Sequence, residues 1–245
     1  MSAFTETNRQ AFNALAETYR SQAWQVALSH QVSEALRSRR EWLGVDWVND
    51  ASKSPVRLLD YACGAGAITD ALGSWVSEIR GIDLSERMVD AYNRAAQSAG
   101  LSTDCAQAVV GDLISDAQPG PELQGKEFWN FDVAAVGLGF HHFEDPPRAL
   151  ARLSARLKPK SGVLIIVDFL PFDISPDQKG MVMGQEMDKT IKHSGFTEGD
   201  MKTLFEKAGL KDFKFSVVKE QAVLEMEDGT HRRTIFIARG RKGGE

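Results

Sequence analysis

Cysteine is nearly absent from this chain of 245 residues, which contains only Cys63 and Cys105. Two cysteines cannot build a disulfide framework and no Cys/His spacing is typical of zinc binding, so we expect a reducing compartment and no metal site. Long apolar runs are also missing, since no stretch reaches the ~20 residues of a membrane-spanning helix. Residues 1–20 carry Glu6 and Glu17 where a signal sequence would be apolar. We therefore expect a soluble, cytoplasmic protein without a membrane span.

An excess of positive charge is the third feature that the chain lacks. The formal net charge is -5 at pH 7, whereas binding to a nucleic-acid backbone usually needs a basic face. We therefore expect a small-molecule substrate and no nucleic-acid partner. Hydrophobic residues make up 42% of the chain, enough for the core of one domain over residues 1–245, as a monomer or a homodimer.

The most informative stretch is Val56-Arg57-Leu58-Leu59-Asp60-Tyr61-Ala62-Cys63-Gly64-Ala65-Gly66. A short apolar run predicts a buried strand, and the two glycines after Asp60 predict a tight turn into a helix, where the backbone can approach a ligand closely. Two glycines also occur in purely structural turns. A second strand ends at Asp83, 17 positions beyond Gly66, where a carboxylate can accept the ribose hydroxyls of a nucleoside.

Together with Gly111-Asp112-Leu113 and with Phe131-Asp132-Val133 running into His141-His142-Phe143, these motifs resemble the class I S-adenosylmethionine-dependent methyltransferases. The resemblance is to the branch of ubiquinone and menaquinone biosynthesis enzymes and many small-molecule methyltransferases. It covers residues 55–170. One position departs from the family pattern, because Ala62 stands where the Asp-x-Gly-x-Gly-x-Gly motif has its first glycine. Alanine is small, and we expect the cofactor to bind nevertheless.

The resemblance implies a cofactor, S-adenosyl-L-methionine, which leaves as S-adenosyl-L-homocysteine, and residues that hold it. Asp83 would bind the ribose and Asp112 the adenine amino group, while Tyr19 would face the site from the N-terminal lid. The full set of implied cofactor-binding residues is Tyr19, Asp60, Ala62, Gly64, Gly66, Asp83, Leu84, Met88, Gly111, Asp112, Leu113 and Gly137.

Alternating strands and helices predict an α/β fold, with a Rossmann-like, doubly wound, mostly parallel sheet of seven strands and an antiparallel last strand. Phe12, Leu15 and Tyr19 share one helical face, which predicts helices within residues 1–50, and the resemblance implies that these helices form part of a lid. By the same resemblance, residues 55–170 would form the cofactor-binding core, and its fifth strand, at 162–169, is apolar. An insertion at 171–197, with Met181, Met183 and Met187, would roof a hydrophobic substrate or fill gaps in the core.

Residues 198–245 would form a closing helix and strands. The helix is predicted at 198–209. The strands at 212–219 and 232–238 alternate apolar and polar residues, as an antiparallel pair would, with Asp228-Gly229 as a hairpin turn signal. Residues 239–245 would form a frayed tail.

The reaction implied is transfer of a methyl group to oxygen, nitrogen, sulfur or carbon of a small acceptor with an apolar part. If the acceptor is a hydroxyl, a thiol or a protonated amine, a base helps to remove its proton, and histidine suits this role near neutral pH. The candidates are His141 and His142 after the fourth strand and His193 in the insertion. Packing or loop hydrogen bonds would explain the same histidines, and a stabilised carbanion or thiolate needs no base.

Three other functions can be compared with the sequence, and its residues argue against two of them. An NAD-dependent oxidoreductase would share Asp83, but the dinucleotide motif has a third glycine where this chain has Thr69. A nucleic-acid amino-methyltransferase would have an Asn/Asp-Pro-Pro-aromatic motif where this chain has Gly137-Leu138-Gly139-Phe140. A non-catalytic S-adenosylmethionine-binding regulatory or structural protein with the same fold stays open, because fold alone does not determine function.

Overall fold

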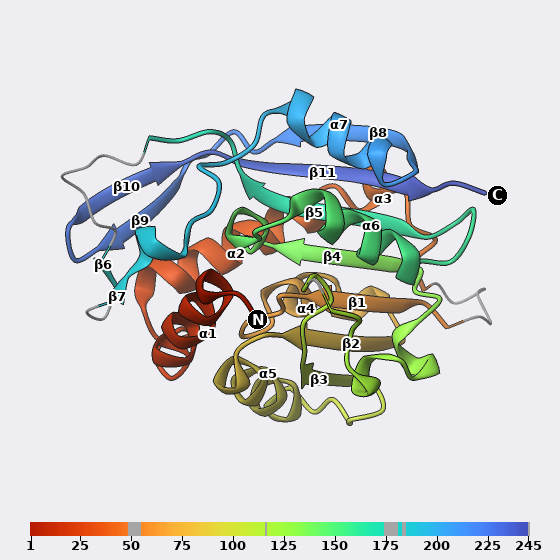
Figure 1. Ribbon diagram of the computed structural model, residues 1–245, viewed down its shortest axis with the longest axis horizontal. Helices are drawn as coiled ribbons and strands as arrows, with labels where there is room; N and C mark the ends of the chain where they lie inside the picture. Colours follow the sequence, from red (N-terminus) through yellow and green to blue (C-terminus); the bar gives the residue numbers. More distant parts are fainter. Residues whose placement is uncertain (49–54, 116, 174–180, 183–184, 245) are drawn as a thin grey trace.

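The computed structural model describes residues 1–48, 55–115, 117–173, 181–182 and 185–244. Seven strands form one sheet in the order β3-β2-β1-β4-β5-β11-β8 (Figure 1). Five of them are parallel neighbours: β1 (Arg57–Tyr61), β2 (Glu78–Asp83), β3 (Ala106–Val110), β4 (Val133–Gly137) and β5 (Val163–Phe169). The last strand, β11 (Ile235–Lys242), runs antiparallel to β5 and to β8 (Leu210–Val217). The predicted fold is therefore confirmed.

Alternating side chains of the strands enter two separate cores, one on each face of the sheet. In β1, Leu58 belongs to the core under α2 (Ala23–Arg37), α3 (Arg40–Leu43), α4 (Ala67–Leu72) and α5 (Glu86–Ser98), while Leu59 belongs to the core under α6 (Pro146–Arg156) and α7 (Glu198–Lys207). Both side chains are fully buried. Helices on both faces place ligands at the carboxyl ends of the parallel strands.

The first helix, α1 (Ala3–Leu15), lies apart from these layers, on the side toward which the arrowhead of β4 points (Figure 1). Its end and the turn after it pack with Met88 of α5 and Val182 of β6 (Met181–Val182) in a small apolar cluster. Tyr19, predicted on the helix, lies in the turn that follows it.

The predicted antiparallel pair of C-terminal strands is confirmed by β8 and β11, but two details are wrong. The turn at Glu227 and Asp228, just before Gly229, does not join that pair; it joins β9 (Ala222–Met226) to β10 (Gly229–Arg233), a separate two-stranded hairpin. Residues 239–242 are not a frayed tail, because β11 continues to Lys242 and Arg239 is buried, with an ion pair to Asp212 at 2.7 Å. The charged residues at this end of β11 suggested exposure to solvent. The sequence alone does not show that an arginine such as Arg239 is buried with an ion-pair partner.

The insertion at 171–197 also contains β7 (Gln185–Glu186), which pairs with β6, and the 3-10 helix η5 (Met187–Thr190). Four more 3-10 helices, η1 (Gly73–Trp75), η2 (Pro121–Leu123), η3 (Lys126–Phe128) and η4 (Phe140–His142), lie between the main elements. Met183 of the predicted roof is outside the described residues.

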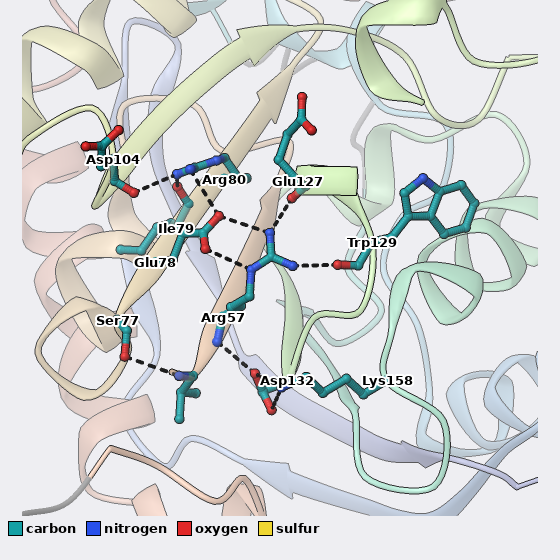
Figure 2. Close-up of polar contacts among 11 residues, drawn as sticks. Arg57, Ser77, Glu78, Ile79, Arg80, Asp104, Glu127, Trp129, Asp132 and Lys158 are labelled. Atoms are coloured by element: carbon teal, nitrogen blue, oxygen red, sulfur yellow. Dashed lines mark hydrogen bonds and ion pairs between the residues drawn. The ribbon is translucent and has the colours of Figure 1, made fainter. Parts of the chain in front are cut away.

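The amino-terminal ends of the strands, opposite the site, are tied together around Arg57 (Figure 2). Its guanidinium donates to both carboxylate oxygens of Glu78, at 2.9 and 3.0 Å, and to the carbonyls of Glu127 and Trp129, each at 2.6 Å. Arg80 also bonds Glu78 at 3.0 Å. Partial burial raises the pKa of Glu78, but the bond and charge of Arg57 and the charge of Arg80 outweigh this and lower it.

Replacing Arg57 by methionine is expected to lower the free energy of unfolding by about 2–4 kcal/mol, because Glu78 and two carbonyls lose a charged donor. Urea titration at pH 7 measures this loss.

The pKa of Glu78 is lowered in the folded state. The stabilising contribution of Glu78 to the free energy of unfolding is therefore present above the unfolded pKa of about 4.3 and is lost as the pH falls through the folded value. The matched control is Arg232→Met at an exposed site, and equal effects of both substitutions would contradict the expectation.

Candidate active site

The loop after β1 keeps its tight turn although its first motif position is alanine. Ala62 has φ 53°, Gly64 φ 48° and Gly66 φ 96°, all left-handed. Such a conformation costs an L-residue ~1–2 kcal/mol, which explains glycine in the motif. A Cβ at Gly66 would lie 3.3 Å from the Tyr92 ring, whereas one at Gly64 would meet no atom within 4 Å. The space beside Gly64 is therefore open.

Asp83, at the end of β2, connects this loop to the next one. Its Oδ2 accepts a hydrogen bond from the Gly64 amide at 2.8 Å, and its Oδ1 accepts one from the Ser85 amide at 2.8 Å. Burial raises the pKa of Asp83, and the amides of Ser85, Gly64 and Leu84 oppose this by binding the charged form. Each carboxylate oxygen has a second lone pair, so Asp83 can still accept hydrogen bonds from a ligand.

A cavity of about 450 Å³ opens at these carboxyl ends, lined by the loops after β1, β2, β3 and β4 and by α1 and α2. Asp112 lies at the β3 loop, where its Oδ1 accepts from the Ile114 amide at 2.8 Å and the Ser115 amide at 3.1 Å. The predicted cofactor residues in the cavity wall are Tyr19, Ala62, Gly64, Asp83, Leu84, Met88, Asp112 and Gly137.

Four predicted cofactor residues are not in the cavity wall. Gly66 faces a second pocket beside Tyr92, Asp60 and Leu113 are fully buried, and a Cβ at Gly111 would meet the Leu123 side chain at 2.7 Å. No described residue of 171–197 lines the cavity. Met187 packs on the small cluster of Leu15, Ala16, Met88 and Val182. Helices α1 and α2 cover the cavity.

Asp60 belongs to a buried polar chain. Thr69 donates from Oγ1 to Asp60 Oδ2 at 2.8 Å and lies 2.8 Å from the Tyr92 hydroxyl, while Asp60 Oδ1 has no partner among the described residues. Burial raises the pKa of Asp60 to about 8. The negative charges of Asp83 and Asp70 also raise this pKa, whereas the hydrogen bonds from Thr69 lower it. The unliganded protein therefore holds this carboxyl protonated at neutral pH.

Replacing Asp60 by asparagine is expected to stabilise the unliganded protein more at pH 8 than at pH 5. The folded pKa lies above the unfolded value of about 3.9. Below pH ~3.9 the wild-type carboxyl therefore does not change the free energy of unfolding. As the pH rises from there to the folded pKa, the carboxyl lowers the free energy of unfolding by about 1.4 kcal/mol per pH unit. Urea titrations of both proteins at the two pH values measure the difference. The same change in unfolding free energy at both would show that Asp60 does not titrate as described.

The three candidate histidines lie near the ends of β4 and β5 but differ in surroundings. His142 lines the cavity, and its Nδ1 lies 2.7 Å from the carbonyl oxygen of Thr190. A carbonyl only accepts, so Nδ1 carries the proton and Nε2 keeps a lone pair. Burial and the charge of His141 lower the pKa of His142 well below its usual value, against the effect of Thr190. His142 is therefore a neutral acceptor at the cavity.

His141 and His193 do not line the cavity. The His141 ring is buried, with Nδ1 2.8 Å from Asp168 Oδ1 and with its centroid 4.0 Å from that of His142. The His193 ring lies tilted against that of Phe196, with 5.4 Å between the ring centroids, and its Nε2 is buried without a hydrogen-bond partner among the described residues. His141 can position His142 by packing against it, whereas His193 is separated from the cavity wall.

Asp168 is the residue that the sequence analysis missed. The fifth strand was expected to be apolar, but Asp168 is fully buried in it and accepts hydrogen bonds from the amides of His141, at 3.0 Å, and Phe169, at 2.7 Å. A single acidic residue at the carboxyl end of an otherwise apolar strand was the available signal, because burying a carboxylate requires such partners.

The described residues contain no group of His, Cys, Asp and Glu side chains suited to a metal ion. Within the same part of the chain, no helix has the length and apolar character needed to cross a membrane.

The cavity residues fit S-adenosylmethionine. Asp83 offers acceptors for ribose hydroxyls, Asp112 offers one for an amino group, and the open space beside Gly64 admits a ligand against the backbone. The volume lies within the usual range of small-molecule sites.

The chain matches known proteins along most of its length. Residues 28–214 match the family model described as a methyltransferase domain. An uncharacterised methyltransferase of Schizosaccharomyces pombe is 30% identical over 204 residues, which are 78% of this chain and 68% of that protein. A ubiquinone biosynthesis O-methyltransferase of Coxiella burnetii is 27% identical over 138 residues, 48% of this chain and 54% of the relative.

Solved structures show the same fold at low sequence identity. YcgJ of Bacillus subtilis has a TM-score of 0.59 at 16% identity, covering 88% of this chain and 99% of that one. Magnesium protoporphyrin IX methyltransferase of Synechocystis has a TM-score of 0.60 at 16% identity, covering 99% of both chains. With the family match over most of its length, this chain belongs to the class I S-adenosylmethionine-dependent methyltransferases.

Proposed function

We propose that the chain methylates a small molecule that has an apolar part and a dissociable proton on its acceptor atom. The observation that carries this proposal is the state of His142, a neutral histidine in the cavity wall whose tautomer is set by Thr190. A base of this kind is useful only if the acceptor must lose a proton. Hydroxyl, thiol and ammonium groups meet that condition, whereas thiolates and stabilised carbanions do not.

Asp83 would hold the ribose of the cofactor and Asp112 its adenine end, while the loops of Gly64 and Gly137 would border its methionine part. When bound, S-adenosylmethionine supplies an electrophilic methyl group on a sulfonium. The protein's own tasks are to place the acceptor atom in line with that methyl group, to exclude water and to remove the acceptor's proton. His142 Nε2 takes this proton.

Apolar side chains support the expected character of the acceptor. Phe12 of α1, Leu138 after β4 and Phe143 after η4 all line the cavity. Phe12 packs edge-to-face on His142, with 5.1 Å between the ring centroids. An apolar portion of the acceptor would therefore lie against these rings when its reactive atom is at His142.

The proposal is tested by incubating the protein and S-adenosylmethionine with separate pools of small phenols, aliphatic alcohols, amines and thiols. Mass spectrometry then detects products that have gained one methylene. Turnover of phenols, alcohols, amines or thiols supports the proposal. Methylation of carbon only contradicts the need for a base and hence the role of His142.

A further inference from the structure

Helix α1 lines the cavity and also contacts the start of α5. Thr5, Asn8 and Phe12 line the cavity. Arg9, which also lines the cavity, and Asn13, which does not, reach the start of α5, where Figure 1 also places α1. Arg9 bonds both carboxylate oxygens of Glu86, at 2.6 and 2.8 Å. The Glu86 side chain is 51% exposed, and exposed ion pairs contribute ~0–1 kcal/mol, so Arg9 is not the main attachment.

Asn13 makes the more buried attachment. Its Oδ1 accepts from the Ser85 hydroxyl at 2.6 Å and from the Arg87 amide at 3.1 Å, and its Nδ2 donates to Glu86 Oε2 at 2.8 Å. These partners fix the orientation of the amide group, because an amide N–H only donates and a carboxylate only accepts. Ser85 is 1% exposed with Asn13 in place, so its hydroxyl is covered in this docked position of α1.

Ser85 carries the connection to the cofactor site. It caps α5 by accepting from the Met88 amide at 3.1 Å, and its own amide donates to Asp83 Oδ1 at 2.8 Å. One chain of hydrogen bonds therefore runs from Asn13 on the lid helix, through Ser85, to the carboxylate of Asp83. Asn13 itself is absent from the cavity wall, so any effect on the cofactor must pass through this chain or through the placement of α1.

We propose that Asn13 is a positioning residue that joins closure of α1 to the orientation of Asp83 through Ser85. The inference rests on the proposed binding of S-adenosylmethionine at Asp83. With α1 docked, Asn13 holds the Ser85 hydroxyl and so fixes the turn 83–85. By reciprocity, a ligand that orders Asp83 favours the docked position of α1.

The test measures the Kd of S-adenosylhomocysteine by calorimetry for the wild type and for Asn13→Ala, Ser85→Ala and the double variant. Asn13→Ala is expected to raise Kd about tenfold, the effect of one hydrogen bond of about 1.4 kcal/mol. In the Ser85→Ala background the same substitution is expected to change Kd less than about threefold, because groups in one network are not additive. The control is Gln10→Ala, which removes an exposed bond on α1 to Glu6 at 2.8 Å and is expected to leave Kd unchanged.

Three results would overturn the inference. They are an unchanged Kd in folded Asn13→Ala, an equal rise in both backgrounds, and an equal rise in Gln10→Ala. If the variants do not fold, hydrogen exchange of the wild type decides: protection of residues 3–15 should increase with S-adenosylhomocysteine, and unchanged exchange overturns the coupling. Absence of binding to the wild type would instead overturn the proposed function and, with it, this inference.

Discussion

Replacing Asp83 by alanine is expected to weaken S-adenosylhomocysteine binding at least tenfold, which corresponds to about 1.4 kcal/mol. The partly buried carboxylate lies in the cavity wall and has acceptor capacity beyond its bonds to the Gly64 and Ser85 amides. Removing it takes away the group that would hold the ribose and releases the two amides that shape the loops. The expected size follows from hydrogen bonds to charged groups, which contribute about 1.5–3 kcal/mol. Calorimetric titration of the folded variant measures the loss.

Asp83→Asn is the matched variant for this prediction. It keeps one acceptor oxygen at nearly the same volume, so its Kd should lie between those of the wild type and Asp83→Ala. Circular dichroism and urea titration establish that each variant is folded. A folded Asp83→Ala protein with wild-type affinity would show that Asp83 shapes the loops without contacting the ligand.

Replacing His142 by asparagine is expected to lower kcat about 100-fold or more with an acceptor that loses a proton, the usual contribution of a general base. Asparagine retains an N–H near the position of Nδ1 that can donate to the Thr190 carbonyl, but it has no basic nitrogen. Affinity for S-adenosylhomocysteine should change little, because the substitution removes the base and not the ribose site. Steady-state kinetics with an acceptor found in the screen, together with calorimetry, separates the two effects.

The control for His142 is His193→Asn, since His193 does not line the cavity; it should retain most of the activity. The pH profile gives a second check. Burial and His141 lower the pKa of His142, and the neutral form is the active one, so kcat should persist below pH ~6.5 and fall only at more acidic pH. Equal losses in both variants, or an acid limb above the ordinary histidine pKa, would contradict the assignment.

The core of the fold was predictable because its signals are local. Buried strands such as β1 and β5 are short apolar runs, and Ser85 and Asp145 cap helices through bonds that their residue types favour, to Met88 and Arg148 respectively. The C-terminal strands were harder, because their registers depend on partners far away in sequence. Charged residues near the end of β11 gave no local sign that the strand continues.

The site was predictable where backbone geometry or strand ends dictate it. Gly64, Asp83 and Asp112 follow from turn chemistry and from the common edge of a parallel sheet, and all three line the cavity. The buried partner Asp168 and the attachment through Asn13 could not be read in the same way, because each depends on a contact between distant segments. At Ala62 the residue type argued against the observed conformation. Alanine adopts a left-handed conformation less readily than glycine, but Ala62 adopts it because the loop requires it.

The most direct test of the account is calorimetric titration of the purified wild-type protein with S-adenosylhomocysteine, and in parallel with NAD. The account predicts one-site binding of the sulfur nucleoside in the micromolar range and no binding of NAD, because Asp83, Asp112 and the loop of Gly64 would hold a single nucleoside. Folded protein that binds no S-adenosylhomocysteine would contradict the central claim and would favour a non-catalytic role for this fold.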